Sequence, residues 1–230
     1  MAQLFPRSAN TIAKASIVVG VVFMATVGGI AHSLDRGPYT TNQSIVRDQP
    51  VPFSHEHHVK GLGIDCRYCH TSVEESHFAG IPPTKTCMTC HSQVWTNAEV
   101  LRPVRESWRT NAPLQWNRVH DLADFVYFNH GAHINKGVGC STCHGPVDRM
   151  PLMWQHGALT MAWCLECHRE PENFVRPREQ VYNMDYRVDR DSGRKNPDGT
   201  APTQAQLGEQ LVKEYNIRKD QLTNCSICHR

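Results

Sequence analysis

The chain has 230 residues, with 24 basic and 22 acidic side chains and a formal net charge of +2. This near balance argues against a nucleic-acid-binding protein, which normally has a basic excess on one face. Five Trp, six Tyr and seven Phe are too many aromatic residues for a disordered chain. Ten cysteines and fourteen histidines, however, are far more than an ordinary domain of this size needs, so the chemistry is sought in these two residue types.

An apolar segment near the N-terminus predicts a membrane helix. Residues 15–31 carry no charge and follow Arg7 and Lys14. With the small residues before it, this run approaches the length of about 20 residues that a helix needs to cross a bilayer. We expect a single-pass anchor in the cytoplasmic membrane, spanning about residues 12–31. Because Arg7 and Lys14 precede the span, the positive-inside rule places the N-terminus in the cytoplasm.

The same segment also allows a second interpretation. Gly29 and Ala31 are small residues of the kind found before a signal-peptidase cut, so a cleaved signal peptide is the alternative to the anchor.

Every cysteine lies in a C-x-x-C-H motif, the attachment site of c-type haem. The two thiols add to the two porphyrin vinyl groups, and the histidine becomes the proximal iron ligand. Five motifs with no cysteine left over predict five covalently bound haem c groups, attached on the periplasmic side of the membrane. The cysteines are Cys66, Cys69, Cys87, Cys90, Cys140, Cys143, Cys164, Cys167, Cys225 and Cys228, and the proximal histidines are His70, His91, His144, His168 and His229.

Three other uses of the cysteines fit less well. Disulfides would not require a histidine after each pair. Zinc knuckles would make the same histidine a coincidence repeated five times. A thioredoxin-like dithiol needs a βαβ context, which the sequence does not show.

The chain repeats an F-x-H-x-x-H segment, each time ahead of two haem motifs. Phe53 with His55 and His58 recurs about 75 residues later as Phe128 with His130 and His133. Such a fixed period indicates a duplicated structural unit. Histidines at i and i+3 on one helical turn point to nearly the same side, so we predict that His55, His58, His130 and His133 are distal ligands of neighbouring haems.

The fifth haem has no partner from the repeat. We assign His120 to it, because His120 precedes the second unit and has no duplicate. Methionine is the rival ligand, and a His/Met pair would raise the potential of that haem. His77 and His156 are weaker candidates, whereas His32 and His57 fit polar roles away from iron. The candidate methionines are Met150, Met153 and Met161.

The expected fold is mostly irregular with small α-helices, because haems supply much of the core. A capping box at 203–206 predicts a helix through Leu207, Leu211 and Tyr215. Residues 171–202 carry six acidic and six basic side chains, so we expect an irregular arm that is not buried. The expected domains are an anchor at 1–34, a linker at 35–50, a first dihaem unit with connector at 51–119, a second dihaem unit at 120–170, and the arm, helix and fifth haem site at 171–230.

The repeated F-x-H-x-x-H and C-x-x-C-H pattern resembles the cytochrome c7/c3 class of multihaem cytochromes. Four connecting stretches narrow the resemblance: FPRSAN at 5–10, GIPPT at 80–84, VHDL through YF at 119–128, and MAWCLECHR at 161–169. Together with five haem motifs they resemble the pentahaem cytochrome c subunit of bacterial alternative complex III, a quinol oxidoreductase. Ala123 departs from the resemblance, because proline is expected there.

This resemblance implies an electron-transfer subunit with no catalytic residues of its own. It also implies partners: polytopic quinol-binding membrane subunits, another cytochrome c and an iron–sulfur subunit. Electrons would pass to a periplasmic acceptor or a terminal oxidase. Two alternatives remain at this stage. One is a multihaem reductase of a small nitrogen or sulfur oxyanion with one open haem. The other is the same electron-transfer role in a different membrane complex, such as a quinone reductase fed by periplasmic cytochromes.

Overall fold

The computed structural model describes residues 5–229 and divides into two units, Met1–Gln43 and Ser44–Arg230. Within the described residues it contains short helices, turns and irregular segments but no strand. Isolated antiparallel bridges, such as Val46 with Trp154 and Val138 with Val175, are the nearest approach to a sheet in that part of the chain. The expectation of a mostly irregular, small-α fold is therefore confirmed.

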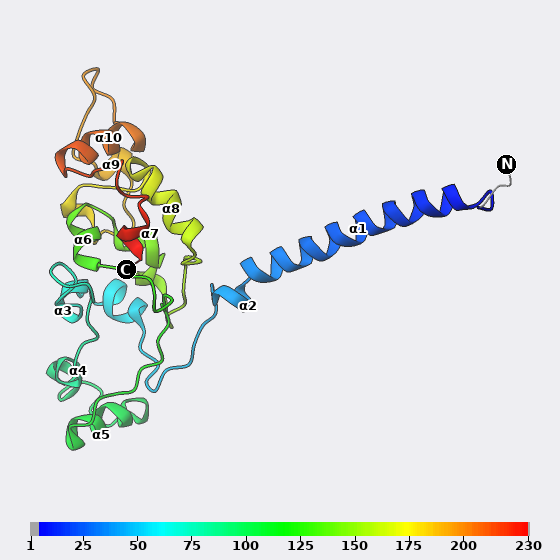
Figure 1. Ribbon diagram of the computed structural model, residues 1–230. Helices are drawn as coiled ribbons and strands as arrows, with labels where there is room; N and C mark the ends of the chain where they lie inside the picture. The colour runs from blue at the N-terminus through cyan, green and yellow to red at the C-terminus, as the bar shows by residue number, and fades with distance from the viewer. Residues whose placement is uncertain (1–4, 230) are drawn as a thin grey trace. The chain divides into compact units, whose positions relative to one another are not determined.

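Helix α1, Ala9–Arg36, makes up most of the first unit (Figure 1). It has no buried residue, and it is long and apolar enough to cross a membrane by length and composition. It continues past the predicted span into the polar residues 32–36. The helix ends where the Gly37 N–H bonds to the Leu34 carbonyl, 3.3 Å away, and Pro38 starts the short helix α2, Pro38–Thr41. Proline disfavours a helical conformation in the residue before it. The Gly37–Pro38 pair, and not the end of the apolar run, therefore sets the C-terminal end of α1.

The second unit consists of short helices joined by irregular segments, with α4 and α5 at one end of it and α9 and α10 at the other (Figure 1). Each C-x-x-C-H motif forms or overlaps a short helix. The elements are η1 Glu56–Gly61, α3 Cys66–Cys69, α4 Thr84–His91, η2 Glu99–Leu101, α5 Arg102–Thr110, α6 His130–Asn135, α7 Cys140–His144, η3 Val147–Arg149, α8 Met161–Arg169, η4 Pro171–Asn173, η5 Arg178–Gln180, α9 Val188–Asp191, α10 Gln204–Glu214 and α11 Cys225–Cys228.

The polypeptide core is divided into small clusters. One contains Val51, Leu101 and Val104, beside the half-buried Cys87. A second contains Val73, Ile134 and Val181, beside Cys140. The third and largest contains Val138, Val175, Leu207, Leu211 and Tyr215. Each cluster touches a haem-motif cysteine or lies beside one, so these contacts hold the motifs in place.

The expectation that 171–202 is not buried is wrong for its first part. Val175 and Val181 are each only 1% exposed, and the Arg176 side chain is also buried. The charged composition of the segment hid this, because two valines were enough to join two different clusters. The first part of the arm therefore packs into the domain and is not a solvated loop.

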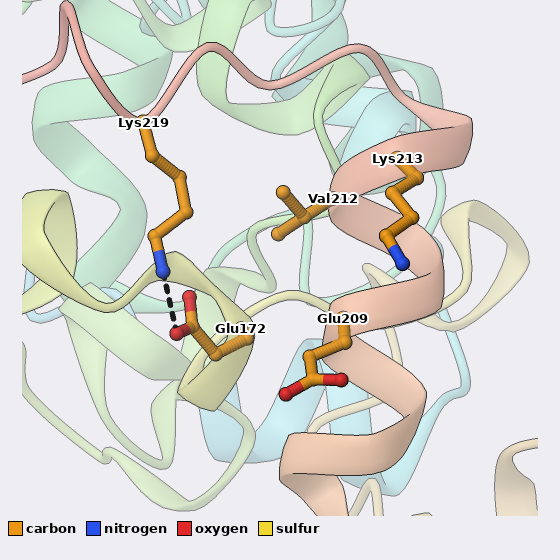
Figure 2. Close-up of a pocket in the computed structure, with 5 residues that line it drawn as sticks. All are labelled: Glu172, Glu209, Val212, Lys213 and Lys219. Atoms are coloured by element: carbon orange, nitrogen blue, oxygen red, sulfur yellow. Dashed lines mark hydrogen bonds and ion pairs between the residues drawn. The ribbon is translucent and has the colours of Figure 1, made fainter.

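Helix α10 confirms the predicted capping box. The Thr203 hydroxyl accepts from the Gln206 N–H, and the Gln206 side chain accepts from the Thr203 N–H. The helix packs closely on η4: a Cβ at Gly208 would come within 2.6 Å of the Glu172 Cα. Figure 2 shows the surface hollow beside this contact, where Lys219 pairs with Glu172 at 2.6 Å.

Candidate haem-binding sites

The ten cysteines form no disulfide, and burial raises the pKa values of several of them. Burial first, then neighbouring thiol charges, raises the pKa values of Cys140 and Cys143 to about 12. Redox-active dithiols need the opposite shift, so the arrangement opposes a thioredoxin-like role. Nor do residues 5–229 gather three or more His, Cys, Asp or Glu side chains around one point as a metal cage would.

Four of the five proximal histidines have Nδ1 next to a backbone carbonyl oxygen. The contact measures 2.6 Å from His70 to Gly80 and 3.2 Å from His91 to Val94. A metal-bound imidazole normally donates its second N–H in this way, which fixes the tautomer and turns the other nitrogen to the metal. The remaining two contacts are His168 to Leu222, 2.9 Å, and His229 to Phe125, 3.1 Å.

Three of the five predicted distal histidines are held in the same manner. Nδ1 of His58 lies 2.8 Å from the Ser54 carbonyl oxygen, and Nδ1 of His133 lies 2.7 Å from that of Asn129. In His130 the acceptor is the His77 carbonyl at 2.9 Å. Each ring therefore has Nε2 free to face an iron.

Three proximal rings lie opposite predicted distal rings at nearly one distance. The ring centroids are 6.2 Å apart in His58 and His91 and 6.2 Å apart in His130 and His144. They are 6.1 Å apart in His133 and His168. The first member of each pair comes from an F-x-H-x-x-H segment and the second from a haem motif.

This distance fits a metal ion between the two rings. Imidazole nitrogens bind metals at about 2.0 Å, and ring bonds of about 1.33 Å place the centroid roughly 1.1 Å behind the nitrogen. Two such ligands on opposite sides of one iron are therefore separated by about 6.2 Å, centroid to centroid. The residues present fit the haem irons that the motifs imply.

His55 is the remaining histidine of the two F-x-H-x-x-H segments, and it lies close to His70. Burial, then the charge of His70, lowers the pKa of His55 to about 4, so the ring is neutral and able to bind a metal. Its Nδ1 is buried without a hydrogen-bond partner.

The two F-x-H-x-x-H segments have matching geometry. Phe53 stacks on His58 at 4.4 Å and meets His55 edge-on at 4.9 Å. Phe128 stacks on His133 at 4.4 Å and meets His130 edge-on at 4.7 Å. Sequence reasoning gave the phenylalanines no role, although their place in the repeat was a signal. Each one fixes the orientation of the two histidines that follow it.

Large apolar side chains are exposed in and beside the haem motifs. A free surface of this kind is costly in a soluble domain and marks a place where something packs. Porphyrin faces held by the adjacent cysteines would cover it. These side chains include Tyr68, Phe78, Ile81, Trp95, Phe125, Met161 and Ile227, which are 43–66% exposed.

The structure places His120 beside the third motif. Its Nε2 lies 3.2 Å from Nδ1 of His144, and the two ring centroids are 4.4 Å apart. The ring near His229 is that of Phe125, at 5.8 Å. The assignment of His120 to the fifth haem stays a prediction, and this arrangement does not favour it.

The other candidates lie in varied surroundings. The His156 ring approaches Gly145, where φ is +68° and a Cβ would come within 2.7 Å of that ring's Nδ1. The exposed His57 ring stacks on Trp95 at 6.2 Å. His77 contributes its backbone carbonyl to His130, and His32 lies on the exposed surface of α1. Of the methionines, Met150 is fully buried, Met153 is half-buried and Met161 is 64% exposed.

Part of the chain is similar in sequence to known proteins. Residues 126–230 match the family model of cytochrome c7 and related cytochrome c. The chain is also similar to the menaquinone reductase multihaem cytochrome c subunit of Nitratidesulfovibrio vulgaris, with 37% identity over 99 residues. The match covers 43% of this chain and 46% of the relative, so the chain spans less than half of the relative's length. Residues 126–230 are therefore similar in sequence to the cytochrome c7 class of multihaem cytochromes.

Proposed function

We propose that the chain is a membrane-anchored pentahaem cytochrome c that carries electrons within a quinone-linked oxidoreductase. The observation that carries the proposal is the set of three histidine pairs at 6.1–6.2 Å. Bound haem supplies one-electron exchange at its iron. A histidine on each side closes that iron to substrates, so the chain's own residues favour electron transfer over catalysis.

The residues of the chain position and insulate the haems. Each motif would anchor one porphyrin through two cysteines. Backbone carbonyls orient four of the five proximal rings, and Phe53 and Phe128 orient the histidines of the repeated segments. Burial lowers the pKa values of His55 and His120 to about 4. These rings therefore stay neutral at physiological pH.

Contacts between motifs give the proposed order of the electron path. The hydroxyls of Tyr68 and Thr89, inside the first two motifs, are 2.9 Å apart. Helix α6 carries both His130 and His133, which face the third and fourth motifs.

The remaining links join the first motif to the third and the fourth to the fifth. Val73, three residues after the first motif, lies in the buried cluster that packs against Cys140 of the third, so the first motif lies near the third. His168 of the fourth motif reaches the carbonyl of Leu222, just ahead of the fifth. The path therefore runs through motifs 2, 1, 3, 4 and 5, and its two ends are the second and fifth motifs.

The finer identity proposed is the pentahaem subunit of alternative complex III. Its partners would be polytopic quinol-binding subunits, a further cytochrome c and an iron–sulfur subunit. The haem domain would lie in the periplasm, with a terminal oxidase or a soluble protein as acceptor. Support comes from the resemblance of the connecting stretches and from the apolar helix α1. The relative's name, a menaquinone reductase, supports quinone linkage and leaves the reverse direction of flow as the competing proposal.

Carbon monoxide binding tests the closed-iron part of this proposal. Replacing His133 by alanine should increase the carbon monoxide bound per reduced chain by one, because one iron loses its distal ligand. As a control, His57→Ala changes an exposed histidine next to His58. It should leave the number of carbon monoxide molecules bound per chain unchanged. Unchanged binding in His133→Ala would contradict the ligand assignment. An open iron in the wild-type chain, with turnover of nitrite or sulfite by the chain alone, would favour the oxyanion reductase.

A further inference from the structure

The third haem motif differs from the other four in the partner of its proximal histidine. His70, His91, His168 and His229 each have Nδ1 at a backbone carbonyl oxygen. In His144 the partner is a side chain, Nε2 of His120, at 3.2 Å. The two rings meet edge-on, with an interplanar angle of 76°.

The direction of this hydrogen bond follows from ligation. If the His144 ring binds iron, it does so through Nε2, because Nδ1 faces His120. A neutral imidazole carries its proton on the nitrogen that is not bound to metal, so Nδ1 of His144 donates and Nε2 of His120 accepts. That acceptor lone pair is then unavailable to another iron.

The backbone just ahead of His120 is held in place. The Asn117 amide N–H donates to the Gln49 side chain at 2.9 Å, and the Asn117 side chain donates to the Asp48 carbonyl at 2.6 Å. Arg118 pairs with Asp121 across His120 at 2.9 Å. These contacts hold the segment that carries His120 beside His144.

We propose that His120 is a positioning residue for His144 and not an iron ligand. By accepting a hydrogen bond from Nδ1–H, His120 holds the His144 ring nearly parallel to His130, at an interplanar angle of 6°. An imidazole nitrogen is a stronger base than an amide oxygen, so this partner makes His144 a more electron-rich ligand than a carbonyl would. A more electron-rich ligand favours ferric iron, which lowers the potential of the third haem. The inference rests on haem attachment at the third motif, but it does not require quinone linkage.

The test compares His120→Phe, which removes the acceptor, with His120→Gln, which restores an acceptor oxygen. Haem content by intact mass, low-spin signals by electron paramagnetic resonance and midpoint potentials by redox titration are measured on each full-length chain. We expect His120→Phe to keep every low-spin haem and to raise one potential. Removing the hydrogen-bond partner of a metal ligand alters metal affinity by about tenfold or more. A tenfold change in the equilibrium constant of a one-electron couple corresponds to about 59 mV.

His120→Gln should recover at least half of the shift, and the control His57→Gln should show none. His120→Leu gives the same prediction as His120→Phe without added aromatic bulk, should the larger variant fail to mature. Loss of one low-spin haem in His120→Leu and His120→Gln would show a ligand and overturn the proposal. Full haem content with unchanged potentials in His120→Leu would reduce His120 to packing and overturn it as well. Quinone-dependent activity is assayed separately, so its failure would leave this result intact.

Discussion

The imidazole rings of His133 and His168 face each other at a centroid distance of 6.1 Å with an interplanar angle of 29°. The residues are distant in sequence, and each ring is oriented by a backbone carbonyl that accepts from its Nδ1. The separation fits two axial ligands of one iron. The same relationship in the other pairs is what the proposed electron path rests on.

Replacing His133 by methionine should raise the potential of one haem. A Met/His pair favours ferrous iron more than two histidines do, and axial ligands move haem potentials over a range of about 0.8 V. We expect the midpoint potential of that haem to rise by an amount on the order of 0.1 V, a small fraction of this range. Spectroscopic redox titration measures the change. His57→Met should leave all potentials unchanged. A His133→Met chain with the wild-type titration curve would contradict the assignment.

Replacing Cys225 and Cys228 together by alanine should remove one haem and leave the other four. Helix α11, which carries both cysteines, has no buried residue. Losing the haem attached there should therefore not disturb the buried clusters. Intact-mass spectrometry counts the haems directly. A wild-type mass with fewer than five haems, or a double variant that loses more than one, would count against one haem per motif.

Replacing Arg176 by methionine should lower the potential of the haem at the third motif. The buried guanidinium donates to the side chains of Ser141 and Thr142 inside that motif. Burial lowers the pKa of Arg176, but an arginine remains charged at neutral pH. A positive charge favours the reduced haem.

A unit charge about 10 Å from the iron contributes about 1–2 kcal/mol at an effective dielectric constant of about 20. That is several tens of mV, since about 59 mV corresponds to a tenfold change. The exposed Arg187 is the control, because Arg187→Met should move no potential by a similar amount. An unchanged or higher potential in Arg176→Met would contradict the electrostatic account.

Replacing Gly208 by alanine should destabilise the C-terminal part of the domain. Alanine favours a helix over glycine by about 1 kcal/mol, but its Cβ would collide with the backbone of Glu172. Backbone cannot move aside as a flexible side chain does, so overpacking of about 1–3 kcal/mol or more should win. Thermal unfolding should show a lower Tm than in Gln210→Ala, on the exposed side of α10. An equal or higher Tm would show that η4 yields easily.

Removing residues 1–36 while supplying an independent export signal should release the haem domain from the membrane. Helix α1 has no buried residue and is apolar enough to cross a bilayer. Fractionation of cells gives the location of the truncated chain, and the mass of the wild-type chain tells an anchor from a cleaved signal peptide. A mature wild-type chain starting near residue 32 would contradict the anchor.

Part of this arrangement could be predicted because haem attachment is a local pattern. The C-x-x-C-H motifs and the F-x-H-x-x-H repeat singled out, without knowledge of the fold, histidines that the structure brings together in pairs. Which histidine faces which motif depends on long-range packing, so only the structure could bring His133 to His168. His120 shows the limit, because a histidine without a duplicate looked like a ligand but lies against Nδ1 of His144. Val175 and Val181 were missed because a charged composition obscured two isolated buried residues.

The most direct test of the account is reduction of the haems by quinol. The protein is purified from membranes in mild detergent with its associated subunits, a menaquinol analogue is added, and the reduced c-type haem band is followed. Quinone linkage with this chain as the path predicts rapid reduction that is lost when the partners are removed. If the haems do not respond to quinol, and oxidised menaquinone does not reoxidise them after chemical reduction, the account is contradicted.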